Sequence, residues 1–304
     1  MSDIIIIGGP TGTGKTSIGI ELSKRLDGEI ISADSVQIYR GLDIGSAKAT
    51  TEEMKGIPHH LIDISNPDYN YSVAEFQKEA LKIIDEIIAR GKVPIIVGGT
   101  GLYINSLIYD WKFNDTPPDL KCRKIVSRIY ETKGIEGLVE ELNSLSDHID
   151  SLDYNNPRRV MRALEIALLG GNLGRDDNRK PRKEYSFHCF ALIRDREKLY
   201  DAINIRVDNM MENGLLNEAY RLYSKQLNRD LSSQRAIGYK ELYDYFDGNC
   251  SKDDAVSKIK QHSRQYAKRQ LTWFKNQGNF IWIDRDIWND DDKLIEHIIE
   301  TVYG

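Results

Sequence analysis

The segment at residues 9–16 has the residue types and the spacing that bind linked phosphate groups. It reads GPTGTGKT and matches the pattern GxxxxGK[ST]. In this pattern backbone N–H groups surround the phosphate oxygens, the lysine adds a positive charge, and the last hydroxyl is a ligand for Mg²⁺. ATP, another nucleotide or a non-nucleotide diphosphate would each satisfy such a loop. We predict a loop that binds two linked phosphate groups of one of these ligands, with Mg²⁺ as cofactor and Thr16 as its protein ligand, made of Gly9, Pro10, Thr11, Gly12, Thr13, Gly14, Lys15 and Thr16.

Asp34 is the first candidate for an acid or base near this loop. It follows the mostly apolar residues 30–33. It could hold a metal ion in a small-molecule kinase, accept a proton from an incoming nucleophile, or merely cap the turn after a strand. A hydrolytic NTPase would be expected to carry a strand ending in an acid that holds Mg²⁺. The run PIIV at 94–97 is followed instead by Gly-Gly-Thr, so the residues leave the role of Asp34 open.

The elements that must position these residues alternate between strands and helices. Helical spacing of apolar residues follows the capping box Ser72-Val-Ala-Glu75 and predicts a helix to Gly91. Apolar runs predict strands at 4–7, 29–32, 60–64 and 93–97. This alternation favours a parallel sheet, whose ligands bind outside the carboxyl ends of the strands. We therefore predict an α/β fold with a P-loop NTPase-like parallel sheet core flanked by helices, in which the loops 9–16, 34–39 and 98–101 form one site.

The pattern changes to short helices after residue 115. Asn156 as N-cap and Pro157 at the first helical position mark the start of one of them. Residues 170–184 lack periodicity and predict a mobile loop. The predicted helices cover 119–131, 135–145 and 157–169, and strands follow at 187–193 and near 280–283. We predict a core domain at 1–112 and 186–304. A helical insertion domain, made of the short helices, is predicted at 113–185.

Charge is segregated along the chain. The formal net charge of −5 over 304 residues argues against indiscriminate nucleic-acid binding. The segment 255–275 nevertheless carries six cations and no acid, which allows a local basic surface. The apolar runs fall far below the roughly 20 residues that span a bilayer, and no heptad seam is present. We expect a cytoplasmic monomer that contacts no membrane.

Seven segments occur in the order seen in one enzyme family. They are GPTGTGKT, ADSVQIYRGLDIGSAK, PHHLIDI, VGGTGLY, NNPRRVMRALE, AIGYKEL and RQYAKRQLTWF, from about residue 5 to 275. In these segments the chain resembles the tRNA dimethylallyltransferase family, bacterial type. The resemblance implies transfer of a dimethylallyl group from dimethylallyl diphosphate to N6 of the adenosine next to the anticodon, with release of diphosphate. The loop at 9–16 would then bind a prenyl diphosphate rather than ATP.

The resemblance also implies catalytic roles for four residues. Asp34 would accept a proton from N6 as the amine attacks, and Thr100 would orient the same amine. Lys15 and Arg206 would stabilise the negative charge that develops on the diphosphate. Without the resemblance, Arg206 would be read as a solvated arginine on a helix.

The resemblance further implies contacts to the anticodon stem-loop of tRNA, from which the target adenosine must be flipped. Without it, Arg158, Arg159 and Arg162 would be read as the solvated face of a surface helix. The cations Arg264 and Lys268 could equally be solvated or face RNA. The implied contact residues are Asp34, Ser35, Val36, Gln37, Thr100, Arg123, Arg158, Arg159, Arg162, Arg235, Gly238, Tyr239, Lys240, Arg264 and Lys268. Two other readings remain: a P-loop small-molecule kinase and a non-catalytic RNA-binding module. The sequence departs from the family pattern most clearly at 170–184.

Overall fold

A parallel β-sheet forms the centre of the computed structural model, which describes residues 1–113, 119–146, 152–171, 173, 180–277 and 279–304. Its strand order is β3-β2-β4-β1-β5-β6, and every neighbouring pair is parallel. The strands are β1 (Ser2–Gly8), β2 (Gly28–Ser32), β3 (His59–His60), β4 (Val93–Val97), β5 (Tyr185–Ile193) and β6 (Ile281–Asp284). The predicted α/β fold with a parallel sheet is confirmed.

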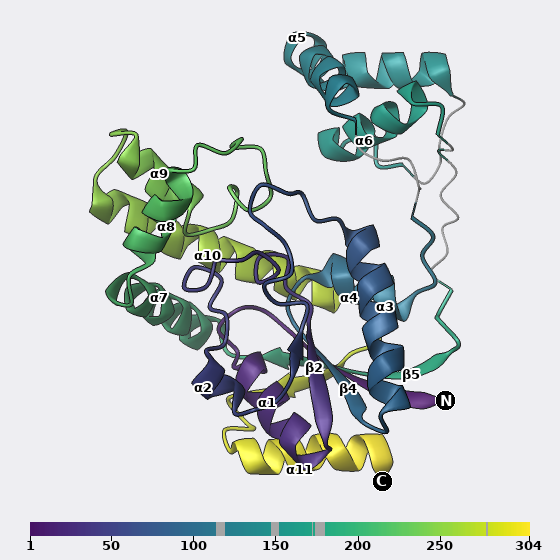
Figure 1. The fold of residues 1–304 in the computed structure, drawn as a ribbon, viewed down its shortest axis with the longest axis vertical. Helices are drawn as coiled ribbons and strands as arrows, with labels where there is room; N and C mark the ends of the chain where they lie inside the picture. Colours follow the sequence, from purple (N-terminus) through teal and green to yellow (C-terminus); the bar gives the residue numbers. More distant parts are fainter. Residues whose placement is uncertain (114–118, 147–151, 172, 174–179, 278) are drawn as a thin grey trace. The chain divides into compact units, whose positions relative to one another are not determined.

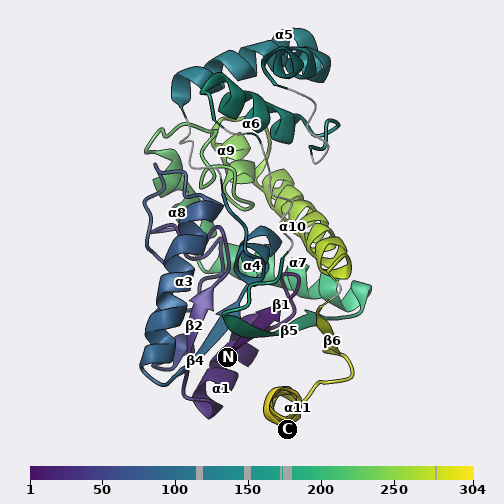
Figure 2. The same cartoon turned by 90° about the vertical axis from the view of Figure 1, so that its right-hand side faces the viewer.

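Helices cover both faces of this sheet (Figures 1 and 2). Helices α1 (Lys15–Arg25) and α11 (Asp291–Tyr303) pack against each other and bury one face through Ile5, Ile95 and Phe190. On the other face lie α3 (Val73–Ala89) and α4 (Gly101–Ile108). The remaining helices of this part are α2 (Thr51–Met54), α7 (Arg196–Glu212), α8 (Leu215–Tyr223), α9 (Lys240–Phe246) and α10 (Lys252–Lys275).

The central strand is buried because its side chains are apolar on both faces. Ile4, Ile5, Ile6 and Ile7 are fully buried, as expected for a strand with neighbours on both sides and helices on both faces. Strands β2, β3 and β4 lie on one side of β1 in the sheet, and the later strands β5 and β6 lie on its other side. Loops at the carboxyl ends of β1, β2 and β4 are therefore brought to one edge of the sheet.

The contacts divide the chain into two compact units. One contains Met1–Ile108 and Arg182–Gly304, and the other contains Tyr109–Pro181. The second unit consists of α5 (Leu120–Leu145) and α6 (Pro157–Leu168), which bury Val126, Leu138 and Val160 between them. The backbone of α5 is broken at Gly134, which has φ 67° and ψ −161°. It thus consists of two helical segments, as the sequence predicts. Residues 172 and 174–179 of the predicted loop at 170–184 lie outside the described residues.

One predicted element differs from the structure. The strand predicted at 60–64 is wrong, because β3 contains only His59 and His60. Leu61 and Asp63 adopt left-handed conformations, φ 60° and 56°, which turn the backbone out of the sheet. The chain then pairs with the loop after β2, through Ile64 N–H to Ile38 O at 2.9 Å. The short helix α2 and the C-terminal helix α11 are not among the elements that the sequence analysis predicts.

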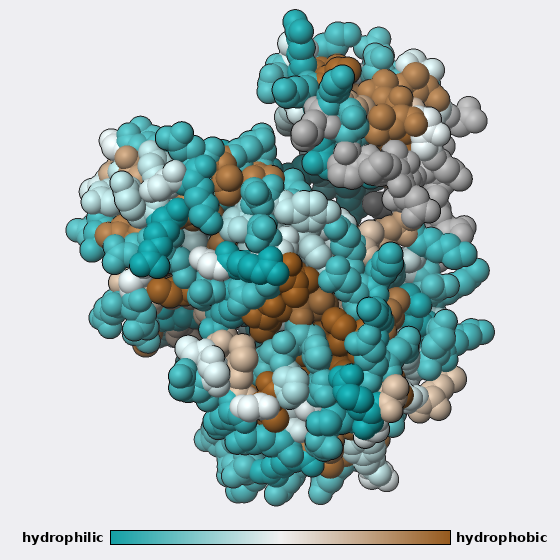
Figure 3. All heavy atoms as spheres, viewed as in Figure 1, coloured by the Kyte–Doolittle hydropathy of each residue, from teal (hydrophilic) through white to brown (hydrophobic). Residues whose placement is uncertain are grey.

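None of the described helices is long and apolar enough to cross a membrane. The face of the molecule in Figure 3 is largely hydrophilic, with an apolar patch near its centre.

Candidate active site

The loop between β1 and α1 is shaped to bring backbone N–H groups to a ligand. Gly9 has φ +132°, and a Cβ atom there would lie 2.4 Å from the carbonyl oxygen of Leu192, so only glycine fits. Gly14 is the N-cap of α1 in a left-handed conformation and supplies no side-chain hydrogen bond to the first turn. The N-terminus of a helix without a side-chain cap is an anion site.

Lys15 lies over this loop. Its Nζ donates a hydrogen bond to the carbonyl oxygen of Pro10 at 2.7 Å, and the hydroxyl of Thr13 donates to the same oxygen at 2.9 Å. Burial, and after it the charge of Arg206, lower the pKa of Lys15 to about 7, although the charge of Asp34 opposes the shift. The protein alone therefore leaves this ammonium short of negative charge, a deficit that a bound phosphate would correct.

Arg206 reaches the same place from α7. This helix packs against the loop at Gly12, where a Cβ atom would lie 3.3 Å from Ile203 and 3.4 Å from Leu199. Burial lowers the pKa of Arg206, while the negative charge of Asp34 raises it. Lys15, Arg206 and Asp34 thus lie within electrostatic reach of one another. The structure brings together two cations and one acid that the sequence separates by up to 191 positions (206 − 15).

Asp34 is held by its own turn. Its Oδ1 accepts hydrogen bonds from the backbone N–H groups of Val36 at 2.8 Å and Gln37 at 3.3 Å. Asp34 therefore does cap the turn after β2, but only one carboxylate oxygen is used, and within the described part of the chain Oδ2 has no hydrogen-bond partner. The residue is half-buried, so the second oxygen remains available as a proton acceptor.

Thr100 joins this turn to the loop after β4. Its hydroxyl accepts a hydrogen bond from Ser35 N–H at 3.1 Å, and its own N–H donates to Ala33 O at 3.1 Å. A Cβ atom at Gly98 would lie 2.3 Å from Ala33 O, so the two loops are in direct backbone contact. The three loops predicted to converge do so.

Gln37 is turned into its own loop. Its side-chain oxygen accepts a hydrogen bond from the Ser32 hydroxyl at 2.9 Å, and its side-chain nitrogen donates to the carbonyl oxygens of Ser46 and Ala47 at 3.3 and 3.4 Å. Reading the edge of a base with this amide would require one of these hydrogen bonds to be exchanged. Gln37 therefore supports the loop in this structure.

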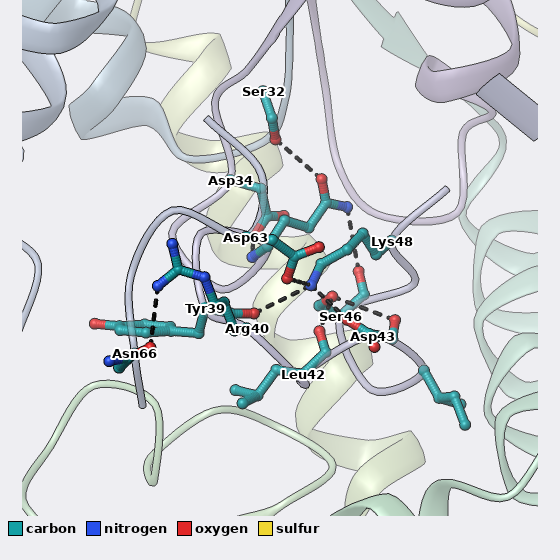
Figure 4. A network of polar contacts seen from close by, with 12 residues as sticks. Ser32, Asp34, Tyr39, Arg40, Leu42, Asp43, Ser46, Lys48, Asp63 and Asn66 are labelled. Carbon is teal, nitrogen blue, oxygen red and sulfur yellow. Dashed lines mark hydrogen bonds and ion pairs between the residues drawn. The ribbon is translucent and has the colours of Figure 1, made fainter. Parts of the chain in front are cut away.

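Lys48 closes the same loop (Figure 4). Its side chain is only 5% exposed and pairs with Asp43 and Asp63 at 2.5 Å each. It also donates to the backbone oxygen of Tyr39 at 3.1 Å. A buried ammonium with two carboxylates and a carbonyl is well satisfied, so the loop 34–48 is a fixed support for Asp34.

The segment with Gly238 and Tyr239 is less accessible than expected. Tyr239 is fully buried and its hydroxyl donates to Glu218, while buried Gly238 donates its N–H to Glu241 at 2.8 Å. The predicted tRNA contact is thereby left to the exposed neighbours Arg235 and Lys240. Arg235 pairs with Asp230 at 2.5 Å, and Lys240 lies 3.7 Å from Glu241.

Helix α10 carries the two other predicted cations of this unit. Arg264 donates to the side-chain oxygen of Asn204 at 2.5 Å. Lys268 is exposed and forms no ion pair with any residue that the structure describes. Lys260, two turns earlier, is neutralised by Asp208 at 2.6 Å.

The second unit contains the other four arginines that were predicted to contact tRNA. Arg158 and Arg159 are exposed, and Arg159 lies 3.9 Å from Asp153. Arg123 and Arg162 both reach Glu165, at 3.2 and 2.9 Å, whose side chain is only 5% exposed. The sequence analysis missed Glu165, although its place on the inner face of α6 was visible in the helical spacing. This carboxylate fixes the direction of two predicted contact residues.

The protein offers few metal ligands of its own. Across the described ranges, no three His, Cys, Asp or Glu side chains are grouped to hold a metal ion. Thr16 is exposed at the start of α1. Mg²⁺ keeps several waters and binds phosphate oxygens, so one hydroxyl beside a diphosphate site fits it.

Comparisons with known proteins place the chain among enzymes. A family model described as IPP transferase matches residues 37–277. A tRNA dimethylallyltransferase from Exiguobacterium sp. is 53% identical over 282 residues, covering 92% of this chain and 90% of the relative. One from Bacillus cereus is 50% identical over 284 residues, covering 92% and 89%.

Solved structures of enzymes with the same kind of name are also similar to this chain. The tRNA isopentenylpyrophosphate transferase of Bacillus halodurans has a TM-score of 0.75 and 44% identity, covering 100% of this chain and 96% of that chain. A eukaryotic dimethylallyltransferase acting on tRNA has a TM-score of 0.75 at 26% identity, covering 99% and 79%. With the sheet, the phosphate loop and these likenesses together, the chain belongs to the IPP transferase family.

Proposed function

We propose that this protein transfers a dimethylallyl group from dimethylallyl diphosphate to N6 of the adenosine that follows the anticodon in tRNA, and releases diphosphate. One observation carries the proposal. The carboxylate of Asp34, of which only one oxygen is hydrogen-bonded by its own turn, lies close enough to Lys15 and Arg206 to interact with their charges beside the phosphate loop. An anion leaving group and a proton acceptor can thus occupy one site. The relatives' names support the dimethylallyl group as the group transferred and tRNA as the acceptor.

The donor is held through its diphosphate. The N–H groups at the start of α1 bind phosphate oxygens, and Lys15 and Arg206 supply positive charge. Thr16 would help to hold Mg²⁺, which would supply further positive charge for the leaving group. As the bond between the prenyl carbon and the diphosphate oxygen breaks, its electron pair passes to oxygen, and Lys15 and Arg206 stabilise the resulting negative charge.

The acceptor approaches from the side of Asp34. The N6 lone pair forms the new bond to the prenyl carbon, which leaves a positive charge and a surplus proton on nitrogen. Asp34 accepts that proton through the oxygen that its own turn does not use. Thr100, whose hydroxyl already bonds Ser35 N–H, lies beside the same turn and orients the amine.

The exposed cations suit an RNA partner better than a small hydroxyl substrate. Lys268 on α10 and Arg158 on α6 are exposed, and a kinase acting on a small molecule would not need them. We propose that they contact the phosphate backbone of the anticodon stem-loop, and that the protein acts in the cytoplasm as a monomer.

The test is a direct transfer assay. Purified protein is incubated with unmodified tRNA, Mg²⁺ and labelled dimethylallyl diphosphate, with γ-labelled ATP in a parallel reaction. Label should enter RNA only from the prenyl donor, and an equal amount of diphosphate should be released. Consumption of ATP with no prenyl transfer would overturn the proposal in favour of a kinase.

A further inference from the structure

Gln270 connects the phosphate loop to the loop after β4. It lies on α10 and is only 6% exposed. Its Oε1 accepts the backbone N–H of Thr11 at 3.0 Å, and its Nε2 donates to the backbone oxygen of Gly99 at 3.0 Å. One side-chain amide therefore satisfies a donor in the first loop and an acceptor in the second.

The fit between α10 and the second loop is too close for other side chains. A Cβ atom at Gly99 would lie 2.1 Å from Nε2 of Gln270, and one at Gly101 would lie 2.2 Å from the ring of Trp273. Tyr266, one turn before Gln270, interacts with Thr100 and with Gln270 through its phenol group. The face of α10 that carries these residues thus abuts the loop at 99–101 directly.

The bridge continues to the proposed base. Thr100 follows Gly99 and accepts the N–H of Ser35, which follows Asp34. A hydrogen-bonded path therefore runs from Thr11, through Gln270 and the 99–100 segment, to the turn that holds Asp34. The first end of this path belongs to the site proposed for the prenyl donor and the other to the site proposed for the acceptor.

We propose that Gln270 is a positioning residue that sets the spacing between the donor loop and the Asp34–Thr100 acceptor loops. The inference rests on the proposed function, since it assigns the two loops to the two substrates. The amide of Gln270 supplies the one acceptor and the one donor that this arrangement requires. A carboxylate would keep the bond from Thr11 N–H and lose the bond to Gly99 O, and a thioether would lose both.

Transfer between two bound substrates is sensitive to such spacing. The attacking nitrogen and the prenyl carbon must approach to about 3–3.5 Å, and a displacement of about 1 Å can cost about 100-fold in rate. Binding of each substrate alone depends on its own loop and not on the distance between loops. Loss of the bridge should therefore lower the rate of transfer far more than either affinity.

The test compares Gln270→Glu and Gln270→Met with wild type, and uses Gln261→Glu as a matched control, an exposed glutamine on the same helix. Single-turnover rates are measured with both substrates saturating, and dissociation constants are measured separately for dimethylallyl diphosphate and tRNA. We expect both Gln270 variants to transfer about 10- to 100-fold more slowly, with each dissociation constant within about threefold of wild type. The control variant should match wild type in its transfer rate and in its dissociation constant for dimethylallyl diphosphate.

A second readout needs no catalysis. Hydrogen exchange of the peptide that contains Thr11 should be faster in Gln270→Met, because its N–H loses a buried acceptor, and unchanged in Gln261→Glu. Circular dichroism identifies a variant that fails to fold, in which case the Glu variant decides. An unchanged transfer rate, or a rate loss fully explained by weaker binding of one substrate, would overturn the inference. If wild type transfers no label, the proposed function fails, and the exchange result alone decides whether the bridge exists.

Discussion

The hydroxyl of Tyr239 donates a hydrogen bond to the carboxylate of Glu218 at 2.7 Å. The same carboxylate accepts three consecutive backbone N–H groups, those of Asp43, Ile44 and Gly45, at 2.9 Å each. Burial and the charge of Glu218 raise the pKa of Tyr239, so the phenol stays a donor. Glu218 on α8 therefore holds residues 43–45 in place, in the loop that begins at Asp34.

Replacing Glu218 with glutamine should loosen that loop. The amide NH₂ would face N–H groups that need an acceptor, and hydrogen bonds to a charged group contribute about 1.5–3 kcal/mol. We expect Glu218→Gln to lower the free energy of unfolding by about 2 kcal/mol or more in urea denaturation, and to raise KM for tRNA more than KM for the prenyl donor. Tyr239→Phe, which removes one hydrogen bond and keeps the ring, should cost about 1 kcal/mol. Equal losses in the two variants would contradict the special role of the carboxylate.

Asp34→Asn separates the two roles of Asp34. An asparagine oxygen can still accept the N–H groups of Val36 and Gln37, so the turn should persist. It cannot take up a proton, so turnover should fall on the order of 10²- to 10⁴-fold, with tRNA affinity nearly unchanged. Steady-state kinetics and filter binding measure the two quantities. Asp292→Asn on α11 serves as the control, since that exposed side chain pairs with Arg25. Parallel losses of turnover and binding would count against a general base.

The lowered pKa of Lys15 predicts that binding of the prenyl diphosphate takes up a proton. The pKa is about 7 in the free site, and a bound diphosphate raises it by favouring the charged form. Below pH 7 the lysine is already protonated, so the affinity for the prenyl diphosphate should not change with pH through this group. Above pH 7 affinity should fall as pH rises, up to tenfold per pH unit, until the pKa of the bound state is passed.

Calorimetry measures this proton uptake. Titration of dimethylallyl diphosphate in two buffers of different ionisation enthalpy, at pH 6 and pH 8, gives the number of protons bound. The uptake due to the protein should be near zero at pH 6 and approach one at pH 8. Lys15→Arg, which stays charged at both values, removes this difference and corrects for protons on the ligand itself. Identical uptake in wild type and variant at pH 8 would rule out Lys15 as the titrating group.

The sequence predicted the phosphate loop and the strands because these depend on local patterns. The GxxxxGK[ST] spacing and the apolar run at 4–7 each indicate a structure without knowledge of distant residues. Gln270 and Glu218 could not be found in this way, because their partners lie 259 and about 175 positions away. The strand predicted at 60–64 failed for a related reason. The backbone of this segment forms hydrogen bonds with the loop after β2, and the spacing of apolar residues in the sequence does not reveal such a tertiary contact.

Lys268 and Lys260 form a matched pair for testing the RNA surface of α10. They lie two turns apart on one helix, but Lys260 is paired with Asp208 at 2.6 Å, whereas Lys268 is exposed and, within the described residues, unpaired. A lysine that contacts phosphate displaces a condensed counterion, so its removal makes the plot of log affinity against log salt shallower by about one unit. We expect Lys268→Ala to weaken tRNA binding in this way. Lys260→Ala should change the slope less, because Asp208 already neutralises that charge. A filter-binding series in KCl gives both slopes, and equal slopes for wild type and Lys268→Ala would assign Lys268 to solvent.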